Sequence, residues 1–216
     1  MYNKILFSVL IIAITITVTS VLHANPRVQF RFLLQDTMGE ETIGEHASNN
    51  NTDNSSAFLL YENSTYGLKI PYPTNWNKEE NVGNNNSNSS LTDVVRFSSP
   101  FENNNADKSA ENLDVKVDNI SDIQPVSLAN YTNDTIEDIG KDFNIISLDR
   151  NATIGNNSPA YKLEYTGTEQ EVNLNAMIIY SIKGDKVYII TYMAEPLRYS
   201  NDLSMIQKMI DSIEMK

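Results

Sequence analysis

The sequence contains no cysteine, and its two histidines, His23 and His46, both precede residue 58. The missing cysteine excludes disulfides, thiol catalysis and cysteine-ligated zinc. From residue 58 onward, Ser-His-Asp and Cys-His catalytic arrangements are excluded as well. Neither of the two common glycine-rich phosphate-binding motifs occurs. We therefore predict that the chain is not an enzyme, and a carboxylate pair is the one general acid-base device that the composition leaves open.

Positive charge is also scarce, with 16 Lys and Arg against 28 Asp and Glu among 216 residues, a net charge of −12. Nucleic-acid binding needs a basic patch, so this composition argues against it. It argues equally against electrostatic docking on anionic lipid. An acidic, self-repelling surface of this kind is typical of a soluble domain.

The N-terminus has the pattern of an export segment. Lys4 precedes residues 5–22, which carry no charge and are expected to form either the apolar part of a signal peptide or one membrane anchor. A buried helix of a soluble protein is the alternative. We assign residues 1–24 to this leader, residues 25–57 to a polar, largely disordered linker, and residues 58–216 to one folded domain. This organisation predicts an extracytoplasmic protein, either secreted or anchored to the outer face of the cytoplasmic membrane, with membrane contact through residues 5–22 if the leader is retained.

Asparagine is abundant and often lies two residues before Ser or Thr, the pattern of an N-glycosylation acceptor. Chance can produce such sequons in a chain rich in Asn and Ser, and export would make several of them usable. The ten candidates are Asn50, Asn54, Asn63, Asn85, Asn88, Asn119, Asn130, Asn133, Asn151 and Asn156.

The folded domain alternates between strand and helix patterns. Period-two alternation and turn residues predict strands over 58–61, 67–70, 92–98, 113–117, 143–154, 160–166, 172–182 and 187–193. Apolar residues three or four apart predict a helix that follows a cap at Ser127 and weakens at Gly140, and a final helix over 203–213 capped near Ser200 or Asp202. Hairpin spacing indicates an antiparallel sheet, so the expected fold class is α+β, with six or more strands flanked by helices.

The most distinctive stretch is the corner that ends at Trp76, the only tryptophan. Pro71 and Pro73 steer the chain out of a strand, and Pro73 holds Tyr72 extended. Tyr72 and Trp76 together could present an aromatic platform for a sugar or a partner protein. In the alternative interpretation the tryptophan closes one end of the core, because large aromatic side chains dominate core energetics.

Calcium is the one metal for which the sequence offers ligands, since loops of Asp and Asn supply the oxygen atoms that it prefers. The stretch 118–122 contains Asp118 and Asp122, and the stretch 103–107 is rich in Asn. Neither has the glycine and terminal glutamate of an EF-hand loop. A calcium site at Asp118 and Asp122 is therefore one hypothesis, and solvated polar loops are the alternative.

Five segments, in this order along the chain, resemble PsbP-like domains: the corner 66–76, the strand 94–100 that ends in Ser-Ser-Pro, the helix start at Ser127-Leu128, the stretch 156–165, and the strand 187–192 with the final helix after it. The resemblance covers residues 58–216 and implies an antiparallel sheet flanked by helices in an exported protein. The best-known members are extrinsic lumenal subunits of photosystem II, which assist the calcium- and chloride-dependent oxygen-evolving centre without being catalysts. The resemblance does not carry over an imidazole metal site, because this domain has no histidine.

The favoured hypothesis is a non-catalytic accessory domain that assists a membrane or cell-envelope complex, as the resemblance implies. A calcium- or glycan-binding surface module is the alternative. A hydrolase that uses a carboxylate pair is the third hypothesis, with Glu62, Asp93, Glu164 and Glu195 as its candidate carboxylates.

Overall fold

A computed structural model describes residues 57–81, 90–100, 111–123, 125–169 and 171–216. The leader 1–24, nearly all of the linker 25–57, the loop 103–107 and four sequons (Asn50, Asn54, Asn85 and Asn88) lie outside these ranges. No helix in the described ranges is long and apolar enough to cross a membrane.

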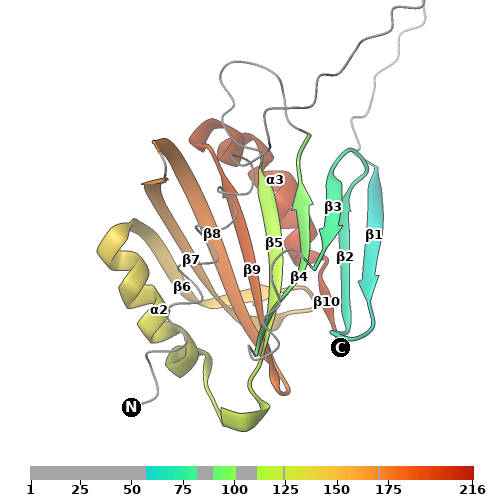
Figure 1. Ribbon diagram of the computed structural model, residues 1–216, viewed down its shortest axis with the longest axis vertical. Helices are drawn as coiled ribbons and strands as arrows, with labels where there is room; N and C mark the ends of the chain where they lie inside the picture. Colours follow the sequence, from blue (N-terminus) through green and yellow to red (C-terminus); the bar gives the residue numbers. More distant parts are fainter. Residues whose placement is uncertain (1–56, 82–89, 101–110, 124, 170) are drawn as a thin grey trace, which may run out of the picture. The chain divides into compact units, whose positions relative to one another are not determined.

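The described residues form an α+β fold, as predicted, with ten strands, two α-helices and one short 3-10 helix (Figure 1). The strands are β1 (Phe58–Asn63), β2 (Leu68–Pro73), β3 (Asn77–Glu80), β4 (Leu91–Ser98), β5 (Asn112–Asn119), β6 (Asn144–Ile154), β7 (Ser158–Glu169), β8 (Val172–Lys183), β9 (Lys186–Ala194) and β10 (Glu214–Met215). The helices are η1 (Ser121–Ile123), α2 (Leu128–Asp142) and α3 (Pro196–Asp211).

The strands make two antiparallel sheets. The large sheet has seven strands in the order β3-β4-β5-β9-β8-β7-β6, and the small sheet has three in the order β1-β2-β10. The predicted hairpin of residues 172–193 is confirmed, since Lys183 pairs with Lys186 across a two-residue turn in which Gly184 adopts a φ of 63°.

Each face of the large sheet carries its own apolar core. Along β9, Tyr188, Ile190 and Tyr192 face the core that the small sheet and α3 close, whereas Val187 and Ile189 face the core under α2. Helix α2 packs on β6, β7 and β8, at the end of the sheet away from β3 (Figure 1). Strands β4 and β5 therefore turn one apolar face inward and one polar face outward, as the alternation in 113–117 predicts.

Helix α2 begins as predicted and ends later. The hydroxyl of Ser127 accepts a hydrogen bond from the backbone N–H of Asn130, which satisfies one of the free donors at the helix start. Gly140 was expected to weaken the helix, yet α2 continues to Asp142. A helical glycine costs only about 1 kcal/mol, and the burial of Ile139 beside it outweighs that cost.

The predicted start of the final helix was wrong. Helix α3 begins at Pro196 with Glu195 as its N-cap residue, and not near Ser200 or Asp202. Proline suits the first helical turn because its missing N–H would have no helical partner there. The predicted apolar face is confirmed, with Ile206, Met209 and Ile210 buried.

Two strands were missed because they carry no readable pattern. All four side chains of β3 are exposed, so no apolar alternation marks it, although Glu79 pairs with Arg96 on β4. Strand β10 has two residues, and its pairing of Met215 with Leu68 joins the C-terminus to the small sheet.

Candidate functional site

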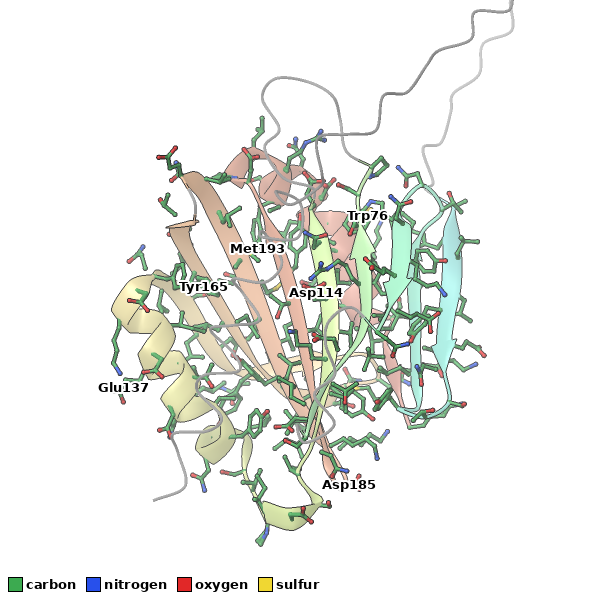
Figure 2. The ribbon with its side chains drawn as sticks, viewed as in Figure 1. Trp76, Asp114, Glu137, Tyr165, Asp185 and Met193 are labelled. Carbon is green, nitrogen blue, oxygen red and sulfur yellow. The ribbon has the colours of Figure 1, made fainter. Side chains whose placement is uncertain are left out.

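The aromatic corner lies between β2 and β3 and is closed by backbone hydrogen bonds. The N–H of Thr74 donates to the carbonyl of Ala57 over 2.9 Å, and the N–H of Trp76 donates to the carbonyl of Pro73 over 3.0 Å. Tyr72 is 9% exposed and Trp76, labelled in Figure 2, is 7% exposed. Both side chains belong to the core between the two sheets.

The corner holds the small sheet against β4. The ring centroids of Tyr72 and Phe97 lie 4.8 Å apart. Phe97 also meets the ring of Tyr61 edge-on, with their centroids 5.9 Å apart. This arrangement agrees with the interpretation in which the tryptophan closes one end of the core. Ligand binding by Tyr72 and Trp76 stays a prediction.

Asp118 and Asp122 occupy different surroundings. Asp118, at the end of β5, is 2% exposed, and its Oδ2 accepts a hydrogen bond from the hydroxyl of Tyr131 on α2 over 2.7 Å. Its Oδ1 is buried without a hydrogen-bond partner in the described ranges. Asp122 is exposed in η1, where its Oδ1 lies 3.4 Å from the hydroxyl of Ser121. No group of three or more Asp, Glu, His or Cys residues in the described ranges is placed to hold a metal ion, and calcium binding at Asp118 and Asp122 stays a prediction.

The contact between Tyr131 and Asp118 fastens α2 to the sheet. Burial, followed by the neighbouring charge of Asp118, raises the pKa of the Tyr131 hydroxyl above its ordinary value. The hydroxyl is therefore protonated at neutral pH and can donate to the carboxylate. Among the described residues, this hydrogen bond from Tyr131 is the contact that stabilises the buried carboxyl group of Asp118.

Tyr131→Phe should therefore lower the free energy of unfolding by about 1–3 kcal/mol, because it leaves the Asp118 carboxylate buried without its donor. Urea unfolding followed by circular dichroism would measure the change. Tyr161→Phe is the matched control, since Tyr161 is half-buried and its described contact is with Arg150 over the ring face. Equal losses in the two variants would contradict the role given to the hydroxyl.

A second polar feature is a row of cross-strand ion pairs on the outward face of β4 and β5, which we call the charged ladder (Asp93, Arg96, Asp114 and Lys116). Arg96 donates from Nε and Nη2 to the two carboxylate oxygens of Asp114 over 2.7 and 3.2 Å. Lys116 lies 2.7 Å from the carboxylate of Asp93. Figure 2 labels Asp114 on β5.

The ladder is held firmly despite its place on the polar face. The side chains of Arg96 and Asp114 are only 15% and 14% exposed. Burial acts to lower the pKa of Arg96, but the hydrogen bonds and the charge of Asp114 outweigh it, so the pKa lies above its usual value. Bidentate geometry of this kind fixes both side chains. The sequence showed the alternation of charge in β5 but not its partners in β4.

A third cluster, which sequence reasoning missed, joins the start of β5 to α3. Glu111 is buried; its Oε2 accepts a hydrogen bond from the hydroxyl of Ser99, and its Oε1 lies 3.5 Å from Nε of Arg198. No local pattern could have revealed it, because the partners come from segments that are distant in the sequence.

Beside this cluster, Tyr192 of β9 and Tyr199 of α3 stack with their ring centroids 5.1 Å apart. Both hydroxyls are buried and lack a hydrogen-bond partner in the part of the chain that the structure describes. Burial raises the pKa of Tyr199 to about 12, and it raises the pKa of Tyr192 as well.

Because the pKa values of these tyrosines are raised in the folded protein, we expect the free energy of unfolding to fall at alkaline pH. The unfolded chain loses each phenolic proton near pH 10, whereas folded Tyr199 holds its proton to about pH 12. The stabilisation is therefore complete below pH 10 and is lost as the pH rises toward 12, by about 1 kcal/mol per tyrosine at pH 11. Urea midpoints at pH 8 and pH 11 would measure it. Tyr199→Phe should weaken the pH dependence, and an unchanged pH dependence in that variant would count against this origin.

The carboxylates that were candidates for acid-base chemistry lie next to cations or at a helix start. Three of them form ion pairs, which are Glu62 with Lys69, Asp93 with Lys116 and Glu164 with Lys162, while Glu195 precedes α3. The described ranges contain neither histidine nor cysteine.

Comparison with known proteins extends these observations. A family model described as "PsbP-like protein" matches residues 8–215. No curated protein sequence shows a significant match. Among solved structures, cyanobacterial PsbP (CyanoP) from Synechocystis sp. PCC 6803 is similar with a TM-score of 0.51 and 16% identity, covering 78% of this chain and 98% of its own. LpqN of Mycobacterium tuberculosis is similar with a TM-score of 0.50 and 12% identity, covering 76% of this chain and 93% of its own. At these identities the two likenesses concern the fold.

Proposed function

This chain belongs to the PsbP-like protein family, and from that membership we propose that it is a non-catalytic accessory domain that binds a membrane or cell-envelope complex outside the cytoplasmic membrane. The observation that carries the proposal is the charged ladder on β4 and β5. Arg96, Asp114 and Lys116 are largely buried in this ladder and Asp93 is its most exposed group. Helix α2 does not cover it, since that helix packs on β6, β7 and β8.

The ladder has the properties of a surface that selects a partner. Charges arranged in a fixed pattern give specificity and orientation more than affinity, because a wrong partner meets like charge. Asp93, at one end of the ladder, has a side chain that is 32% exposed. A partner that approaches β4 would therefore meet an acidic group held in place by Lys116.

The proposed location rests on residues 5–22, whose uncharged run would export the chain and hold it at the membrane if the leader is retained. LpqN, which shares the fold, is described as involved in cell envelope biogenesis. An envelope setting is proposed for this chain too, and a role in an oxygen-evolving complex is not part of the proposal.

Cross-linking of the full-length protein in its membrane tests this function. We expect a specific cross-linked partner for the unaltered chain and at least about a tenfold loss for Arg96→Glu, because the change reverses the charge presented to the partner and a like charge at an interface is unfavourable. Lys141→Glu is the matched control, because it makes the same charge change on the exposed side of α2.

A double variant guards against loss of folding. Arg96→Asp with Asp114→Arg retains an ion pair but exchanges its ends, so thermal unfolding should stay near that of the unaltered chain while the cross-link is lost. Equal cross-linking of all variants, or the absence of any partner in the membrane fraction, would overturn the proposal.

A further inference from the structure

The structure divides the sequons of the described ranges into three environments. The six sequons in these ranges begin at Asn63, Asn119, Asn130, Asn133, Asn151 and Asn156. Because the acceptor is defined by an asparagine and a hydroxyl two residues later, the modifying enzyme must reach both groups together. A usable sequon in the folded domain therefore has an exposed asparagine with a free amide and an accessible hydroxyl on the same side.

Two sequons have their amide groups engaged. The Nδ2 of Asn63 donates to the hydroxyl of Tyr61 over 3.0 Å, and its Oδ1 accepts from the N–H of Tyr66 over 3.2 Å. The Oδ1 of Asn119 accepts from the N–H of Ser121 over 3.0 Å. At both positions the engaged oxygen holds the side-chain amide against the local turn, which restricts the direction in which Nδ2 can be reached.

Two further sequons lie in α2, where the backbone separates the required groups. Side chains two residues apart in a helix point to nearly opposite sides. Thr132, the hydroxyl residue of the Asn130 sequon, is fully buried and donates to the carbonyl of Leu128 over 2.8 Å. Asn133 lies one turn before Glu137, which points away from the sheet (Figure 2), so Thr135 is turned from that outer side.

The remaining two sequons have exposed asparagines, one in β6 and one in the turn after it. Asn151 is exposed where the pairing of β6 with β7 is interrupted between Asp149 and Ala152. Its backbone N–H donates to Oδ1 of Asp149 over 2.8 Å. Thr153 is exposed too, and in an extended strand side chains two residues apart share one face.

The second of these two sequons begins at Asn156. Asn156 is exposed in the turn from β6 to β7, between Gly155 and Asn157, which both adopt positive φ. Its hydroxyl residue, Ser158, is half-buried at the start of β7. No side-chain hydrogen bond engages the amide of Asn151 or Asn156 in the described ranges.

Strand β6 is also the place where a covalent cover would have an effect. It is an outer strand of the large sheet, eleven residues long, and its Ile146 is 58% exposed. A long free edge invites pairing with other strands, and proteins commonly blunt such an edge with charge, bulges or a cover. Its two pairing irregularities and its charged Asp149 and Arg150 already follow this rule.

We propose that Asn151 and Asn156 carry N-linked glycans and thereby cover the free edge of β6, whereas Asn63, Asn119, Asn130 and Asn133 stay unmodified. The inference rests on the proposed export of the chain. In the transfer, Nδ2 of asparagine forms a bond to the anomeric carbon of a lipid-linked oligosaccharide phosphate. The bond from that carbon to the phosphate oxygen breaks, the lipid phosphate leaves, and Nδ2 gives up one proton. Asn151 lies on the outer strand of the large sheet, whereas Asn156 follows Gly155, whose N–H donates to the carbonyl of Ile210 at the end of α3. Neither residue belongs to the charged ladder.

Glycopeptide mass spectrometry tests the assignment. Residues 1–24 are replaced by an established cleavable export signal, and the protein is recovered from a host that glycosylates exported proteins, with a known glycoprotein as positive control. We expect glycan on the peptides of Asn151 and Asn156. Asn151→Gln and Asn156→Gln should each remove one glycan-dependent mobility shift, while Asn63→Gln and Asn130→Gln should change nothing.

Bare peptides at both Asn151 and Asn156, or equal occupancy at all six described positions, would overturn the inference. The substituted signal makes this result independent of the natural leader. Protease accessibility of the natural full-length chain on intact cells reports separately on the proposed location, so a failure of export and a failure of glycan placement give different outcomes.

Discussion

Gly155→Ala is expected to lower the free energy of unfolding by about 4 kcal/mol or more, a loss that only a few mechanisms produce. Gly155 has a φ of 55°, a conformation that costs a residue with a side chain about 1–2 kcal/mol. A Cβ atom at this position would also overlap the carbonyl oxygen of Ile213. The N–H of Gly155 donates to the carbonyl of Ile210 over 3.2 Å, so the change would push the C-terminal end of α3 away from the sheet.

Gly184→Ala separates the two causes. Gly184 has nearly the same φ, 63°, but a Cβ atom added there, at the β8–β9 turn, would have no neighbour within 4 Å. The Gly184→Ala variant should therefore lose only about 1–2 kcal/mol of unfolding free energy, the cost of the backbone conformation. Urea unfolding of both variants by circular dichroism measures the difference, and similar losses would show that α3 can move away from Gly155 at little cost.

Trp76→Ala should be nearly as damaging, with an expected loss of about 3–5 kcal/mol, because it removes the largest side chain of the corner and leaves a cavity. Trp76 is buried in the core shared by the two sheets, beside the aromatic contacts that join β2 to β4. Trp76→Phe keeps part of the apolar volume and should lose less than half as much. Since Trp76 is the only tryptophan, unfolding must be followed by circular dichroism and not by fluorescence.

Leu197→Ala provides the control for this prediction, because Leu197 is 74% exposed and its loss should change stability by at most about 0.5 kcal/mol. If Trp76→Ala were no more harmful than Leu197→Ala, the side chain would not be part of the core. The aromatic-platform hypothesis for Tyr72 and Trp76 would then gain support.

Opposite ends of the large sheet are proposed to have different roles. The charged ladder on β4 and β5 is the surface proposed to meet a partner, and the edge of β6 is the surface proposed to be covered by glycan. Strand order keeps these regions apart, since β9, β8 and β7 lie between β5 and β6. A glycan on β6 and a partner on β4 are therefore compatible in one molecule.

The sequence by itself determined the elements whose signals are local. Alternation identified β5 with one apolar and one polar face, and Lys183-Gly184-Asp185 marked the turn between β8 and β9. Ser127 predicted the start of α2. Such patterns are readable because a strand repeats every two residues, a helix about every 3.6, and a cap depends on its immediate neighbours.

Only the tertiary structure decided which segments meet. Strand β3 has four exposed side chains and is a strand because β4 lies beside it. The pairing of β10 with β2 and the division into two sheets likewise had no local signal. The start of α3 did have one, because proline suits the first helical turn. No local signal marked the charged ladder or the contact of Tyr131 with Asp118, where each partner comes from a different element. The physical reason is that burial and ion pairing depend on distance in space, and a periodic pattern records only which side chains share a face, not what that face will contact.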